Sequence, residues 1–163
     1  MKNMIQKTVF RTLASALGLM ALLFCTTSAI AESSEDGGGG PLAGVWDSVV
    51  TLTNCHGVTL RTLEAYVTFH QGGTLSNFDT NSLNGPGTGT WRNIGGGNYS
   101  APFRFFTFNA AGALTGEVRI TRTIQLAKDA MSYTSTVAVT AFDVNGNQVG
   151  SLCGSEAATR IVD

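Results

Sequence analysis

Eight β-strand runs follow one another between residues 44 and 161, and most of the gaps between them are two to five residues long. Within the runs, apolar and polar residues alternate with the period of two that is typical of half-buried strands. Glycine-rich turns and an Asn145-Gly146 hairpin signal separate the runs. The runs span residues 45–54, 59–70, 74–79, 88–94, 98–109, 113–127, 131–143 and 148–161.

Short connections make consecutive strands antiparallel neighbours. An open sheet of eight such strands would leave two exposed edges, which natural proteins avoid. We therefore predict an all-β fold, a single antiparallel eight-stranded up-and-down barrel. A two-sheet β-sandwich is the alternative.

The first 31 residues have the plan of a secretory signal peptide. Lys2, Lys7 and Arg11 form a positive head, residues 13–24 are apolar, and 29–31 form a small-x-small cleavage site. The apolar run is shorter than the roughly 20 residues that span a bilayer. We expect an exported protein, either periplasmic or secreted.

Cys25 raises the alternative of a lipoprotein anchor, which the bulky Phe24 before it disfavours. Residues 32–43 are expected to form a disordered Gly/Ser/acidic tether, and 44–163 the barrel domain. Without the signal, the chain has seven Lys and Arg residues against eleven acidic ones, about −4 in all. The basic residues are scattered and form no stripe, which argues against nucleic-acid binding.

Two cysteines, Cys55 and Cys153, remain after removal of the signal. An even pair in an exported chain indicates a disulfide. The first and eighth strands are neighbours only if the barrel closes, so this bond would tie the closing seam.

The first run opens with Gly44-Val45-Trp46, and Arg160 stands near the end of the last. In these two features the chain resembles the calycin superfamily, the lipocalins and their relatives. The resemblance implies that Arg160 packs across a buried Trp46 and closes one end of the barrel. The Thr-Asp-x-Arg loop and the C-terminal helix of true lipocalins are absent from the sequence.

A second resemblance covers nearly the whole domain. Asn54-Cys55, residues 68–74, the Gly-x-Gly-x-Trp strand at 87–91, the hairpin at 143–147 and residues 152–154 are similar to motifs of a group of small exported bacterial proteins. That group carries no known activity, so the resemblance implies the fold and the disulfide and no function.

Motifs for chemistry are sparse. His56 and His70 are the two histidines of the chain, too few for a typical metal site, and no Gly-x-Ser-x-Gly nucleophile elbow occurs. We expect no metal, no cofactor and no catalytic residue of these types.

Arg122 shares the apolar phase of its run, so it points into the predicted barrel, where a charge must be paired or meet an anionic ligand. Glu64, Asp47 and Glu156 are possible partners. A strand bulge, or a place at the solvent-exposed barrel end, would explain Arg122 without any ligand. If the barrel has a cavity, phase predicts that its wall includes Val50, Leu52, Val67, Phe103, Phe105, Val118, Ile120, Arg122, Val137 and Val139.

Three functions fit these features. The first is a non-enzymatic barrel that binds a small apolar or carboxylate-bearing amphipathic molecule. The second is a small β-barrel cyclase or isomerase that uses Arg122, Tyr66 or Glu64. The third is a structural or interaction protein whose barrel is filled, with Phe106 and Phe108 on the outer face as a surface for self-association.

Overall fold

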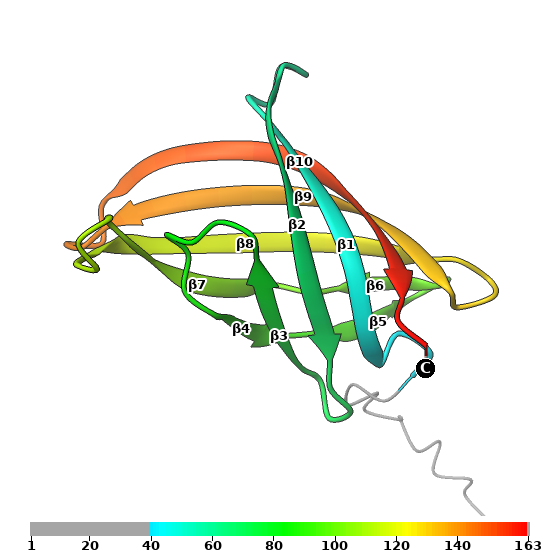
Figure 1. Cartoon of the computed structure of the whole chain (residues 1–163). Coiled ribbons are helices and arrows are strands. Elements are labelled where there is room, and N and C mark those ends of the chain that lie inside the picture. Colours follow the sequence, from blue (N-terminus) through cyan, green and yellow to red (C-terminus); the bar gives the residue numbers. More distant parts are fainter. Residues whose placement is uncertain (1–39, 163) are drawn as a thin grey trace, which may run out of the picture. The chain divides into compact units, whose positions relative to one another are not determined.

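Ten β-strands make up the regular structure of residues 40–162 in a computed structural model (Figure 1). The predicted signal peptide, residues 32–39 of the predicted tether and Asp163 lie outside the described residues. The strands are β1 (Gly44–Thr53), β2 (Thr59–Phe69), β3 (Thr74–Asp79), β4 (Gly87–Thr90), β5 (Arg92–Gly95), β6 (Asn98–Ser100), β7 (Phe103–Phe108), β8 (Leu114–Leu126), β9 (Ser132–Asp143) and β10 (Gln148–Arg160).

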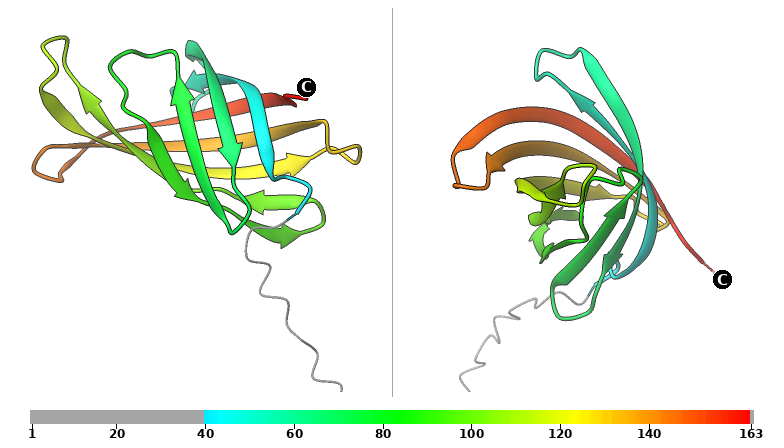
Figure 2. Two further views of the ribbon diagram at one scale, coloured as in Figure 1. Left: turned by 60° about the horizontal axis from the view of Figure 1, so that its bottom comes forward. Right: turned by 60° about the vertical axis from the view of Figure 1, so that its left-hand side comes forward.

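Eight of these strands close into an antiparallel barrel, in the order β8-β7-β4-β3-β2-β1-β10-β9, and β9 pairs back onto β8. Figure 1 shows β8, β9 and β10 as long neighbours, and Figure 2 shows the strands curving round. The prediction of an all-β eight-stranded barrel is confirmed, and the sandwich alternative is not the fold adopted.

The two remaining strands, β5 and β6, arise because two of the predicted runs are each divided. The run 88–94 breaks at Trp91 between β4 and β5, and the run 98–109 breaks at Ala101 and Pro102 between β6 and β7. Proline has no N–H to give to a ladder, so it interrupts pairing. β6 and β7 pair with successive parts of β8, and β5 pairs with β6.

Gly89 explains how β4 approaches this break so closely. A Cβ atom at Gly89 would lie 2.1 Å from the carbonyl oxygen of Pro102. The backbone N–H of Thr90 donates to that same oxygen at 3.1 Å. A side chain at position 89 would therefore force β4 away from the neighbouring chain.

The seam between the first and last strands is long. β1 and β10 pair in an unbroken register from Trp46 opposite Arg160 to Thr53 opposite Cys153. This register brings the N-terminal tryptophan motif, the C-terminal arginine and the second cysteine of the sequence to one seam.

The interior contains two apolar clusters. The first packs large aromatic side chains of Trp46, Phe69, Trp91, Tyr99 and Tyr133 with aliphatic neighbours. The second consists of Leu52, Phe105, Ile120, Val137 and Val139, with partly buried residues around them. We call the barrel end with the first cluster the packed end and the other the open end.

Leu42, just before the first strand, contributes to the core of the barrel. Leu42 is fully buried in the first cluster, and its carbonyl oxygen accepts a hydrogen bond from Nε1 of Trp46 at 3.0 Å. Leu42 and the half-buried Ala43 therefore pack against the barrel, where Leu42 buries its apolar surface. The disordered tether over residues 32–43 stays a prediction.

Candidate functional site

A cavity of about 510 Å³ occupies the open half of the barrel. Its wall is mostly aliphatic and aromatic and is drawn from seven barrel strands and the β3–β4 loop. Some lining residues are deeply buried, whereas Arg61, Leu83, Thr115, Gly150 and Ser151 are exposed. The cavity therefore opens to solvent at the end where these exposed residues lie.

Nine of the ten residues predicted for a cavity wall lie in this one. They are Val50, Leu52, Phe103, Phe105, Val118, Ile120, Arg122, Val137 and Val139. Val67 shares their phase but lies further along β2, fully buried in the packed end. Phase thus predicted the inward face correctly, while it did not predict how far along the barrel the hollow extends.

Arg122 and Glu156 form a buried ion pair at the inner end of the cavity. Nη1 of Arg122 donates to Oε1 of Glu156 at 2.9 Å and to Oε2 at 3.1 Å. Each residue is 2 % exposed. Of the three partners considered for Arg122, the structure selects Glu156, and Arg122 lies inside the barrel instead of at a bulge or a solvent-exposed end.

Two hydroxyl groups complete the hydrogen bonding of the Glu156 carboxylate. Tyr133 donates its phenol proton to Oε1 at 2.9 Å, and Ser135 donates to Oε2 at 2.8 Å. Burial, and secondly the neighbouring Glu156 carboxylate, raise the pKa of Tyr133 well above its usual range. The phenol therefore remains a hydrogen-bond donor to the carboxylate.

The rest of the Arg122 guanidinium faces aromatic rings. Its Cζ lies 4.8 Å from the centroid of Phe103 and 5.6 Å from that of Phe69. Nε and Nη2 are buried and have no hydrogen-bond partner among residues 40–162. Contact with the ring faces offsets part of the cost of burying these donors.

The sequence-based prediction of the cavity wall did not include several residues that line it. Phe108 follows a register shift between Thr107 and Phe108, and this bulge brings its ring to the cavity although alternation placed it outside. Phe106 does point outward and is 56 % exposed. Leu63 and Arg61 share the inward phase of Ala65, so a signal for both was present.

Asp79, Asn81 and Asn84 line the mouth from the β3–β4 connection, which period-two alternation does not describe. Asp79 accepts hydrogen bonds from the backbone N–H of Asn81 at 2.8 Å and from Nδ2 of Asn84 at 2.8 Å. These bonds hold the loop in place beside the opening.

Glu64 and Tyr66, named above for an enzyme, do not face the cavity. Both are exposed on the outer face of β2, where Glu64 pairs across from Val49 and Tyr66 across from Asp47. Arg122 is the one residue of the enzyme hypothesis that lines the cavity.

The packed end is closed by Trp46 and Arg160. The guanidinium Cζ of Arg160 lies 4.2 Å from the Trp46 ring centroid. Its Nε donates to the carbonyl of Ala130 at 2.7 Å, its Nη1 to that of Ala43 at 2.8 Å, and its Nη2 to that of Pro41. Gly44 makes room, because a Cβ there would lie 2.4 Å from Nη1 of Arg160.

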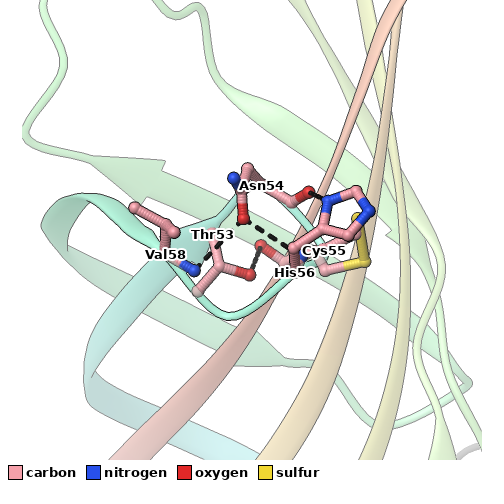
Figure 3. Close-up of a disulfide and its surroundings, with 6 residues drawn as sticks. Thr53, Asn54, Cys55, His56 and Val58 are labelled. Atoms are coloured by element: carbon pink, nitrogen blue, oxygen red, sulfur yellow. Dashed lines mark hydrogen bonds between the residues drawn. A yellow bond between two sulfur atoms is a disulfide. The ribbon is translucent and has the colours of Figure 1, made fainter.

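The predicted disulfide between Cys55 and Cys153 is confirmed, with Cα atoms 4.8 Å apart. Figure 3 shows the loop around it, in which Oδ1 of Asn54 accepts the backbone N–H groups of His56 at 3.0 Å and Val58 at 3.1 Å. The bond ties the start of the β1–β2 loop to β10 near the open end. A disulfide is compatible with an oxidising environment outside the cytoplasm.

Within residues 40–162 no three His, Cys, Asp or Glu side chains gather in a way that would hold a metal ion. The same residues include no helix with the length and apolarity needed to cross a membrane. Comparison with models of protein families gives no match, and comparison with curated proteins gives none either.

Proposed function

We propose that this protein is an exported, non-enzymatic barrel that binds a small apolar or amphipathic molecule in the cavity of its open half. The observation that carries the proposal is the cavity itself, whose volume of about 510 Å³ is bounded mainly by apolar side chains. Small-molecule sites are typically hollows of about 300–1,000 Å³ with such walls.

The two halves of the barrel support the proposal by their contrast. A barrel with a purely structural role has no need of a cavity. At the packed end, large aromatic side chains fill the interior of this barrel. At the open end most inward residues are smaller, mainly valine, leucine and isoleucine beside Phe103 and Phe105, and they leave space open to solvent.

One experiment tests the proposal through a matched pair of variants on β9. Ala141 lines the cavity, whereas Ala138 on the same strand is exposed. Ala141→Phe fills part of the hollow, and we expect it to weaken binding of an apolar fluorescent probe on the order of tenfold, or 1.4 kcal/mol. Ala138→Phe should leave the affinity unchanged, and equal affinity in both variants would refute binding in this cavity.

A second experiment addresses the natural ligand. Native mass spectrometry of the protein purified from its own host should show an added mass that disappears in Ala141→Phe. Full recovery of the adduct in that variant would place the ligand elsewhere on the protein.

A further inference from the structure

The inner end of the cavity is sealed against a polar ligand group. Both carboxylate oxygens of Glu156 already accept hydrogen bonds, from Arg122, Tyr133 and Ser135. Nε and Nη2 of Arg122 are buried, and the Phe103 ring lies against the guanidinium. The pair is also electrically neutral as a whole, so a carboxylate at this depth would meet Glu156 as well as Arg122. It would lose its hydration without an accessible donor, because the two unpartnered donors there, Nε and Nη2 of Arg122, are buried.

The open end differs because it presents an unpartnered cation. Arg61 lines the cavity near its mouth and is exposed, and no described side chain forms a hydrogen bond or an ion pair with it. The two acidic residues of the cavity wall have other partners: Glu156 accepts hydrogen bonds from Arg122, Tyr133 and Ser135, and Asp79 from Asn81 and Asn84. Neither forms an ion pair with Arg61.

The geometry points to tail-first binding of an anionic amphiphile, with its apolar chain in the cavity and its acidic head at Arg61 on the rim. This inference rests on the proposed function and adds the ligand class, the ligand's direction and a residue that recognises its head. The acidic head of the ligand then contacts Arg61 at the mouth of the cavity, and not Arg122 at the inner end, which the sequence suggested.

The first test measures recognition of the head. Dodecanoic acid and its methyl ester are compared by displacement of a fluorescent probe from the wild type, Arg61→Gln and Arg92→Gln. Arg92 is the matched control, an exposed arginine on β5 that does not line the cavity. An exposed ion pair contributes modestly, so Arg61→Gln should weaken binding of the acid about two- to five-fold and leave that of the ester unchanged. Arg92→Gln should change neither, and added salt should reduce the preference for the acid in the wild type.

The second test measures direction, using Trp46 and Trp91, which both lie in the packed end. Bromine quenches tryptophan emission at short range. Dodecanoic acid brominated at its terminal carbon should therefore quench more strongly at saturation than the isomer brominated next to the carboxylate.

The outcomes separate the inference from the proposed function. If neither the acid nor the ester binds, the proposed function fails. If both bind but Arg61→Gln weakens them equally or not at all, recognition of the head by Arg61 is refuted. If the isomer brominated next to the carboxylate quenches as strongly or more strongly, tail-first binding is refuted while binding itself stands.

Discussion

The two ends of this barrel are built from the same eight strands, yet one is packed solid and the other is hollow. Trp46 and Tyr133 meet at the packed end with ring centroids 4.9 Å apart, whereas at the open end Val137 and Val139 face a cavity of about 510 Å³. Both ends alternate inward and outward residues in the same way. Side-chain volume, and not the pattern of alternation, therefore decides where a barrel of this kind is filled.

A buried ion pair marks the boundary between the two ends. Arg122 lies opposite Val137 in the β8–β9 register, and Glu156 lies opposite Ser135 and Val50. The aromatic cluster lies to one side of this level and the cavity to the other. The Arg122–Glu156 pair closes the inner end of the cavity, so substitutions at this pair are the first test of how the two ends differ.

The largest effect is expected from breaking this pair. Arg122→Met leaves an unpaired buried carboxylate, and Glu156→Leu an unpaired buried guanidinium, and each should lower the free energy of unfolding by about 3–5 kcal/mol. The double variant Arg122→Met/Glu156→Leu should recover much of that loss, because an apolar pair has no charge to desolvate. Denaturant titration of the four proteins measures this, and two additive losses would contradict the account.

Two isoleucines on β8 compare the ends directly. Ile124 is fully buried in the packed cluster, while Ile120, four residues earlier, lines the cavity. Truncation of a buried isoleucine costs roughly 2–5 kcal/mol, with the larger values where close neighbours surround the site. Ile124→Ala should fall in the upper half of that range and Ile120→Ala near its lower limit.

The same two variants should differ in the opposite sense in binding. Ile120→Ala changes the cavity wall and should alter the affinity for an apolar probe, whereas Ile124→Ala should not. Equal losses of stability, or an equal change in affinity, would show that the two ends are not packed differently.

Arg160→Ala tests the closure of the packed end. Loss of the contact with the Trp46 ring should lower the free energy of unfolding by up to about 2 kcal/mol. Emission of Trp46 should shift to longer wavelength, measured with Trp91 replaced by Phe in both proteins. Arg92→Ala serves as the control for loss of an exposed arginine, and an unshifted spectrum in Arg160→Ala would remove the role assigned to Arg160.

The smallest effect belongs to the β9–β10 hairpin at the open end. Hydrogen bonds from the side chain and backbone of Asn147 hold the pKa of Asp143 below its ordinary value of 3.8. A lowered pKa means that the ionised carboxylate stabilises the hairpin at neutral pH and that this contribution is lost as the pH falls through the lowered pKa. The melting temperatures of the wild type and Asp143→Ala should therefore differ slightly at neutral pH and converge in acid, and a difference that persists in acid would contradict this account.

Much of the fold could be predicted because it depends on sequence patterns within single strands and turns. Alternation placed the strands, Asn145-Gly146 marked a hairpin, and the phase of Arg122 placed it inside the barrel. The break at Pro102 had a local signal, because proline gives no N–H to a ladder. The break at Trp91 was missed because it depends on how β4 and β7 approach each other. Phe108 was placed outside because a bulge reverses the phase without leaving a mark in the alternation.

The partner and the role of Arg122 could not be predicted from its own strand. Glu156 was one of three candidates, although alternation places Glu64 and Asp47 on the face opposite to the predicted cavity residues. The register of the β9–β10 hairpin places Ser135 opposite Glu156, while the phenol of Tyr133 donates to the same carboxylate. Because that carboxylate is fully engaged and the unpartnered Nε and Nη2 of Arg122 are buried, our proposal places the anionic head at Arg61 and not at Arg122.

By itself the sequence determined an eight-stranded antiparallel barrel, its inward faces and the Cys55–Cys153 bond, because these follow from alternation, turn chemistry and the number of cysteines. The tertiary structure alone decided which half is hollow, that Glu156 neutralises Arg122, and which charge is left free at the mouth. The physical reason is that volume, burial and ion pairing depend on residues from several strands at one level of the barrel. The register between strands determines which residues become neighbours, and the sequence of one strand alone does not specify that register.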